Sequence, residues 1–136
     1  MRKAIKTDKA PAAIGPYDQA TVANHLVFTS GQIPLDPKTG ELIEGGIVDQ
    51  TNQVIRNLQA ILEASGASLD DVLKTTVYVT DLDDFAKVNG VFDQYFRGDD
   101  LPARTFVQVS GLPKGANIEI DAFAYISTQH FSGTGL

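Results

Sequence analysis

The stretch DQTNQVIRNLQAILEAS, residues 49–65, decides the class of fold. Its apolar residues recur with the spacing of an amphipathic helix, at i, i+1, i+4, i+7 and i+8. These residues are Val54, Ile55, Leu58, Ile61 and Leu62. Gly66 follows at the position where helices commonly end. The sequence therefore predicts a helix over residues 49–65 with one buried face.

A strand and a second helix follow this first helix. Residues 73–79 alternate, which predicts a strand with Leu73, Thr75, Val77 and Val79 on its buried face. Asp81 is suited to cap a helix that ends at Gly98. The apolar stripe of that helix comprises Leu82, Phe85, Val88, Phe92, Tyr95 and Phe96.

Strands are predicted on both sides of this central unit. Residues 20–23 and 26–29 read as a hairpin, and residues 104–109 and 118–126 read as strands around a turn-rich segment. The order predicts an α+β fold, a mixed sheet with two helices packed on one face. Because the other face needs a cover, we expect a homo-oligomer. We expect one domain over residues 1–126 and a loose C-terminal tail at residues 127–136.

Composition excludes several kinds of chemistry. The 136 residues contain 11 basic and 17 acidic side chains, a net charge of -6, and no cysteine. Disulfides, thiolate nucleophiles and cysteine-ligated metals are thereby excluded, and nucleic acid or anionic lipid is disfavoured as a partner. His25 and His130 lack metal-ligand spacing, so no metal site is expected. No apolar run approaches the roughly 20 residues of a membrane span. A soluble cytoplasmic protein is expected.

Two charges stand within otherwise apolar strands. Alternation places Arg104 and Phe106 on the other face of their strand from Val107. It places Glu119 on the other face of its strand from Ile118 and Ile120. We expect both charges on the non-core face, where a partner subunit would desolvate them and create a carboxylate site. Spacing alone favours the alternative of a solvated face or an interface salt bridge. If the two strands paired as a simple hairpin, Arg104 would lie roughly 13 Å along the strand from Glu119, which favours sites shared between chains.

Weaker candidates are polar residues near strand or helix ends. Asn89 lies beside the apolar stripe of the second helix, Ser30-Gly31 follows a strand, and Tyr17 follows Gly15-Pro16. From pattern alone, each suits either a ligand pocket or an ordinary structural role.

Four segments in fixed order carry a resemblance to a known family. They are APAAIGPY at residues 10–17, TSGQIP at 29–34, DFAKVN at 84–89, and PAR at 102–104 with IEI at 118–120. This set resembles the signature of the Rid (YjgF) family. The resemblance implies a chorismate-mutase-like fold and a homotrimer with cofactor-free sites between subunits. It also implies hydrolysis of 2-imino acids, 2-iminobutanoate and 2-iminopropanoate, to 2-oxo acids and ammonia, downstream of pyridoxal-phosphate dehydratases.

The resemblance also implies roles for single residues. Arg104 would grip the substrate carboxylate and Glu119 would position the attacking water. The pocket would be lined by Tyr17, Ser30, Gly31, Phe85, Asn89 and Phe106. Phe106 stands where many relatives carry cysteine, and its larger ring is expected to narrow the range of substrates.

Two alternative functions stay open. One is a regulatory trimer that binds small carboxylates or 2-oxo acids without turnover. The other is ribonuclease or translation-inhibitor activity, which the net charge of -6 and the lack of a basic stripe disfavour.

Overall fold

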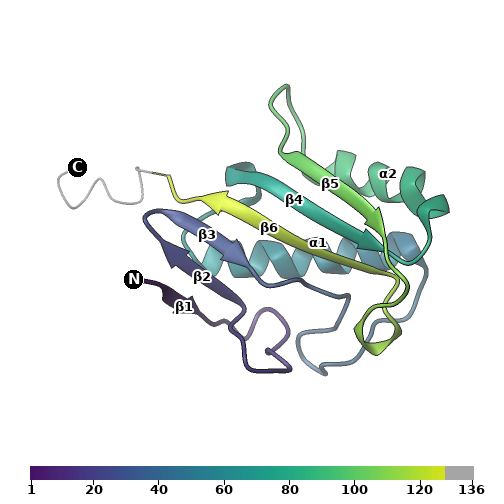
Figure 1. Ribbon diagram of the computed structural model, residues 1–136, viewed down its shortest axis with the longest axis horizontal. Coiled ribbons are helices and arrows are strands. Elements are labelled where there is room, and N and C mark those ends of the chain that lie inside the picture. The colour runs from purple at the N-terminus through teal and green to yellow at the C-terminus, as the bar shows by residue number, and fades with distance from the viewer. Residues whose placement is uncertain (128–136) are drawn as a thin grey trace.

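A six-stranded mixed sheet forms the centre of the computed structural model, which describes residues 1–127. The strands are β1 (Lys3–Ile5), β2 (Ala20–Ala23), β3 (Leu26–Thr29), β4 (Val72–Val79), β5 (Ala103–Gln108) and β6 (Ile118–Tyr125). Their order across the sheet is β1-β2-β3-β6-β4-β5 (Figure 1). Neighbours pair antiparallel except β4 and β5, which are parallel. Apart from Ser127, the predicted tail at residues 127–136 lies outside the described residues, and so does His130.

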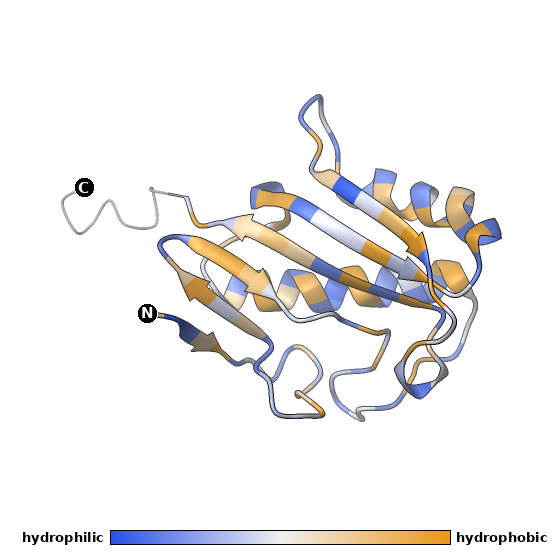
Figure 2. Ribbon diagram, in the orientation of Figure 1, coloured by the Kyte–Doolittle hydropathy of each residue, from blue (hydrophilic) through white to orange (hydrophobic). Residues whose placement is uncertain are grey.

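Both helices, α1 (Ile47–Ala64) and α2 (Phe85–Tyr95), cover the same face of the sheet, as predicted (Figure 1). Hydrophobic and hydrophilic bands alternate along them, the pattern of helices with one buried side (Figure 2). The stripe predicted for α1 is confirmed, because each of its five apolar residues is at most 2% exposed. No helix within residues 1–127 is long and apolar enough to cross a membrane.

The stripe predicted for the second helix is wrong at its N-terminal end. Residues Leu82–Asp84 form a short 3₁₀ turn, η2, with the Asp81 carboxylate accepting a hydrogen bond from the Asp83 N–H at 2.9 Å. Leu82 therefore lies before the α-helix and is exposed, and Phe85, the first helical residue, is exposed as well. The buried residues of α2 are Val88, Val91 and Phe92.

Strand β4 differs from its prediction at one residue. A β-bulge between Val72 and Lys74 turns Leu73 outward, where it is exposed, and buries Val72 instead. From Thr75 onward the predicted alternation holds. The β2–β3 hairpin is also confirmed, with Asn24 and His25 both at positive φ as a tight two-residue turn requires.

The assumed pairing of the last two strands is wrong, because β4 lies between them. Thr75 of β4 pairs with Arg104 of β5, and Tyr78 pairs with Glu119 of β6. The chain passes from β4 through α2 to β5 and therefore enters β5 parallel to β4. The segment after β5, including the 3₁₀ turn η3 (Pro113–Gly115), then leads to β6 on the other side of β4.

The expected facing of Arg104 is wrong as well. Side chains at paired positions point to the same side of a sheet, and Thr75 is buried on the helix side, so Arg104 also faces the helices. Phe106, two residues later, packs against the core. The alternation was predicted correctly, but α2 covers the side that was assigned to a partner. On β6 the prediction is confirmed: Ile118 and Ile120 are buried, and Glu119 points to the opposite face.

The helix-free side, which we call the open face, has an apolar end and a polar middle. Phe28, Phe123 and Tyr125 are each 39–44% exposed at the apolar end, and the rings of Phe28 and Phe123 meet edge to face at 5.1 Å. Tyr78 and Glu119 lie side by side on β4 and β6 in the polar middle. Exposed aromatic side chains on a sheet face are typical of a surface that another chain covers.

Candidate active site

The predicted site residues fall into two separate pockets. The first, the glutamate pocket, has a volume of about 360 Å³. Its walls include residues 11–14 with Tyr17, Ser30, Gly31, Pro113 and Glu119. Three of the four segments that carry the family resemblance thus contribute to one pocket.

Backbone pairing between Gln32 and Ile120 brings Gly31 into close contact with Glu119. The Gln32 N–H donates to the Ile120 carbonyl at 2.8 Å, and the Ile120 N–H donates back to Gln32 at 3.1 Å, so the segment after β3 lies against β6. A Cβ on residue 31 would lie 2.8 Å from the Glu119 Cδ, closer than atoms pack. Glycine is therefore required here for the carboxylate to keep its place.

Ser30 and Tyr17 are held by the loop before β2. The Ser30 hydroxyl donates to the Asp18 carbonyl, and the Ser30 N–H donates to the Gln19 carbonyl at 2.9 Å. The Tyr17 hydroxyl accepts a hydrogen bond from the Ile14 N–H at 3.3 Å. Both side chains therefore shape the pocket wall while their oxygen atoms keep lone pairs for a ligand.

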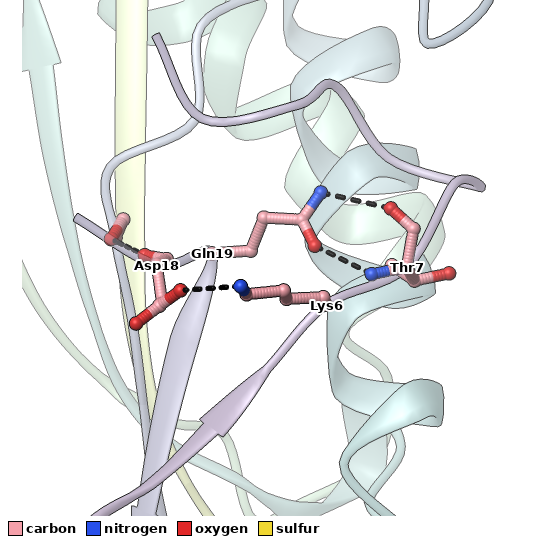
Figure 3. A network of polar contacts seen from close by, with 5 residues as sticks. Lys6, Thr7, Asp18 and Gln19 are labelled. Atoms are coloured by element: carbon pink, nitrogen blue, oxygen red, sulfur yellow. Dashed lines mark hydrogen bonds and ion pairs between the residues drawn. The ribbon is translucent and has the colours of Figure 1, made fainter. Parts of the chain in front are cut away.

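Gln19, which the sequence interpretation missed, ties this wall together (Figure 3). Its Oε1 accepts from the Thr7 N–H at 2.7 Å, and its Nε2 donates to the carbonyls of Thr7 at 3.0 Å and Pro11 at 2.8 Å. The side chain is 4% exposed. An ion pair of Lys6 with Asp18, 3.8 Å long, lies beside it. No periodicity distinguishes a glutamine with this role from one at the surface.

Glu119 carries a carboxylate that is suited to accept a proton. It is half-buried, and the loss of hydration raises its pKa, with a further rise from the nearby Asp121. Burial likewise raises the pKa of Asp121, although hydrogen bonds from Tyr78, at 3.3 Å, and Thr76 act in the opposite direction. A raised pKa makes Glu119 a stronger base than an exposed carboxylate.

The second pocket, the arginine pocket, has a volume of about 420 Å³ and lies between α2 and the edge of the sheet. Arg104, Asn89, Thr75, Asp93 and Pro102 are among the residues that line it. Arg104 forms no ion pair with any residue in the described range 1–127. Burial lowers its pKa and Asp93 acts in the opposite direction, but a guanidinium keeps its charge at neutral pH. The pocket therefore presents a cation without an ion pair among the described residues, with the Asp93 carboxylate in the same lining.

Thr75 is a second residue that sequence reasoning missed. Its side chain is 1% exposed, and within residues 1–127 its Oγ1 has no hydrogen-bond partner. Unpaired buried hydroxyls are uncommon because they lose hydration without compensation. The sequence did contain one sign of this residue: a threonine alternates with Val77 and Val79 on the buried face of β4.

A single chain keeps the two charged groups apart. Arg104 pairs with Thr75 and Glu119 pairs with Tyr78, so they differ by three residues along β4 and lie on its two flanking strands. This offset corresponds to roughly 14 Å between their Cα atoms, and the two side chains point to opposite faces of the sheet.

The other predicted site residues are divided between the two pockets. Asn89 lines the same pocket as Arg104, whereas Tyr17, Ser30 and Gly31 line the pocket of Glu119. Phe85 and Phe106 contact Arg104. The described residues contain no cluster of three or more His, Cys, Asp or Glu that could hold a metal.

Comparisons with known proteins agree with one another. The family model described as Endoribonuclease L-PSP matches residues 7–126. A RutC family protein of Pyrococcus horikoshii is 56% identical over 92% of this chain and 98% of its own length. The 2-iminobutanoate/2-iminopropanoate deaminase of Mus musculus is 48% identical over 91% of each chain. The crystal structure of RidA from an Antarctic Psychrobacter superimposes with a TM-score of 0.87 at 49% identity, covering 91% of this chain and 99% of the other.

The unpaired Thr75 hydroxyl yields a stability prediction. Thr75→Val keeps the shape of the side chain and removes the uncompensated oxygen, so we expect the free energy of unfolding to stay equal or to rise by about 1 kcal/mol. Urea unfolding at matched protein concentration measures it. Thr51→Val is the control, because the buried Thr51 hydroxyl donates to the Ile47 carbonyl at 2.7 Å and its loss should destabilise the protein. Equal destabilisation by both substitutions would show that Thr75 is satisfied.

Proposed function

The chain belongs to the YjgF/Rid family, the Endoribonuclease L-PSP family of the matching model, and we propose that it hydrolyses 2-imino acids such as 2-iminobutanoate and 2-iminopropanoate. Relatives from Mus musculus, Rattus norvegicus and Homo sapiens bear the name of that deaminase and align over most of the chain. One observation carries the proposal: an arginine without an ion pair and a half-buried glutamate with a raised pKa each lie in a pocket of their own.

The proposed reaction matches these two groups. A protonated 2-imino acid has an electrophilic carbon beside a carboxylate. Water adds to that carbon and loses one proton to a base, which returns the proton to the nitrogen of the carbinolamine. The C–N bond then breaks as the hydroxyl gives up its proton and becomes the carbonyl, so the products are a 2-oxo acid and ammonium. The protein needs to hold the carboxylate, orient the water and carry this proton from oxygen to nitrogen.

Each group has a distinct role in this reaction. Arg104 offers a planar fork of N–H donors that matches a carboxylate. Glu119 accepts the proton of the attacking water, and its raised pKa suits that role. Tyr17, Ser30 and Gly31 line the pocket of Glu119 and would face the reacting carbon, and Asn89 lines the pocket of Arg104 and would lie beside the carboxylate. We assign these roles to the residues that the family signature covers.

We propose further that the working site forms between two copies of the chain in a homotrimer. The placement of Arg104 and Glu119 on opposite faces supports this, because one small substrate cannot span roughly 14 Å across the sheet. A copy whose open face covered the edge formed by β5 and α2 would bring its Glu119 to the arginine pocket of its neighbour. The exposed Phe28, Phe123 and Tyr125 would then be covered as well. We place this activity in the cytoplasm, downstream of pyridoxal-phosphate dehydratases.

The alternative activities have weaker support. The family description contains the word endoribonuclease, but an RNA site needs several cations along a surface, and this chain has a net charge of -6. A trimer that binds carboxylates without turnover would use Arg104 alone. Binding alone would leave no role for Glu119, which lies in a separate pocket and has a raised pKa.

The first functional prediction concerns Arg104. A threonine dehydratase generates 2-iminobutanoate in place, and a nucleophile in the buffer traps the free imine, so the added protein should restore 2-oxobutanoate formation. Arg104→Lys should lower kcat/KM by about 100-fold or more, because a point charge cannot reproduce the two-pronged contact. Arg104→Ala should be at least as impaired while it keeps the fold. A lysine variant with parental activity would refute the carboxylate role.

The second functional prediction separates turnover from binding. Glu119→Gln keeps the shape and hydrogen-bonding capacity of the side chain but removes the proton acceptor, so kcat should fall by about 100-fold or more. Affinity for 2-oxobutanoate, measured by calorimetry, should change little. A variant that hydrolyses the imine at the parental rate would leave Arg104 as a binding residue and favour the regulatory trimer.

The third functional prediction tests the shared site. Chains with Arg104→Ala and chains with Glu119→Gln, unfolded together in equal amounts and reassembled, should regain about one quarter of parental activity, because one site in four would combine an intact arginine with an intact glutamate. Light scattering of the product should give the mass of a trimer.

A matched mixture distinguishes the two geometries. The parent mixed equally with the double variant should also show about one quarter of parental activity if sites are shared, but one half if each chain holds a whole site. No recovery in the first mixture together with one half in the second would contradict the shared site.

A further inference from the structure

Three phenylalanine rings surround the Arg104 guanidinium. Its Cζ lies 5.1 Å from the ring centroid of Phe92, 5.2 Å from that of Phe106 and 5.5 Å from that of Phe85. All three distances fall within the range of cation–π attraction. We call these three rings the aromatic cage.

The cage is built from two elements that are fixed by the core. Phe85 and Phe92 lie two turns apart on α2, and Phe106 follows Arg104 by two residues on the same face of β5. Phe92 is 8% exposed, and Phe106 packs against the core. Phe85 and Phe106 meet edge to face at 4.8 Å. Phe85 is 45% exposed and is therefore held by its contact with Phe106, whereas Phe92 packs against Phe96 at 5.3 Å.

A cage holds an arginine in a way that an ion pair does not. A carboxylate would orient the guanidinium but would neutralise its charge and occupy its N–H donors. Aromatic faces attract the cation through their quadrupole and leave its N–H groups available. In the described residues Arg104 has ring contacts and no ion pair, which is the combination that keeps a charged fork oriented and unoccupied.

We propose that Phe85, Phe92 and Phe106 are positioning residues, which fix the Arg104 guanidinium before the substrate carboxylate arrives. The identity of that carboxylate rests on the proposed function, but the orientation of Arg104 does not. Phe106 has the most specific part, because it lies on the strand that carries Arg104 and its ring contacts that of Phe85 on α2. Preorganisation of this kind strengthens binding because less side-chain freedom is lost when the ligand binds.

The rings could instead serve only to fill the core, and the two roles predict different outcomes. A core role predicts that Phe106→Leu lowers stability and leaves carboxylate affinity at the parental value. A positioning role predicts weaker binding at unchanged ligand chemistry, and recovery of binding when an aromatic ring is restored. Phe106→Leu and Phe106→Tyr are therefore a matched pair, because leucine retains apolar bulk and tyrosine retains the ring face.

The test uses the full-length protein in its native assembly and 2-oxobutanoate as the probe. Phe106→Leu should raise the Kd by about 3- to 30-fold, and Phe106→Tyr should stay within about twofold of the parent. In NMR relaxation measurements on the ligand-free protein, the Arg104 Nε–Hε group should be rigid, and Phe106→Leu should raise its mobility toward that of exposed arginines. Phe106→Tyr should keep it rigid.

The outcomes separate this inference from the proposed function. A parent that binds 2-oxobutanoate with Phe106-dependent affinity but hydrolyses no imine would refute the function and support the cage. A Phe106→Leu variant with the parental Kd would overturn the cage whatever the activity. If the parent does not bind the probe, the mobility of the Arg104 Nε–Hε group decides, and a parental mobility in Phe106→Leu would overturn the cage.

Discussion

The pleat of β4 is the constraint on which the rest of this structure depends. Successive residues of a strand point to opposite faces, and β4 lies between β5 and β6 in the sheet. Thr75 directs its partner Arg104 toward the helices, and Tyr78 directs its partner Glu119 toward the open face. The odd spacing of three residues between these two positions is what separates the charges. A register shift of one residue in either pairing would move a charged side chain to the other face.

This separation has a chemical benefit. Arginine and glutamate that met within one chain would form a salt bridge, which would neutralise the cation and lower the pKa of the carboxylate. Here Glu119 has Asp121 as its charged neighbour, and Arg104 has aromatic rings and, without an ion pair, the Asp93 carboxylate. Each group therefore keeps the property that its proposed role in imine hydrolysis requires. In the proposed trimer the two groups meet only at an assembled site, with the substrate between them.

The sequence predicted most of the fold and only part of the site. Helix α1, the β2–β3 hairpin and the core face of β6 follow from local periodicity, which neighbouring elements do not change. Alternation predicted correctly that Arg104 and Phe106 share one face of their strand. It could not predict that the helices cover this face, because the crossover from β4 to β5 decides that. The bulge that exposes Leu73, the separation of β5 from β6 by β4, and the orphan hydroxyl of Thr75 are likewise consequences of tertiary pairing. No pattern within one strand encodes them.

The Gln19 amide has a consequence for how the glutamate pocket can move. One buried side chain bonds the backbone at Thr7, Ala10 and Pro11, so these points cannot detach from the wall one at a time without leaving polar groups unpaired. The segment should therefore open as a single cooperative unit instead of fraying from its N-terminal end. Amide hydrogens along this stretch would then exchange with solvent in step, at one shared opening free energy. In the proposed site, a wall of that kind would select ligands by its shape and not by its motion.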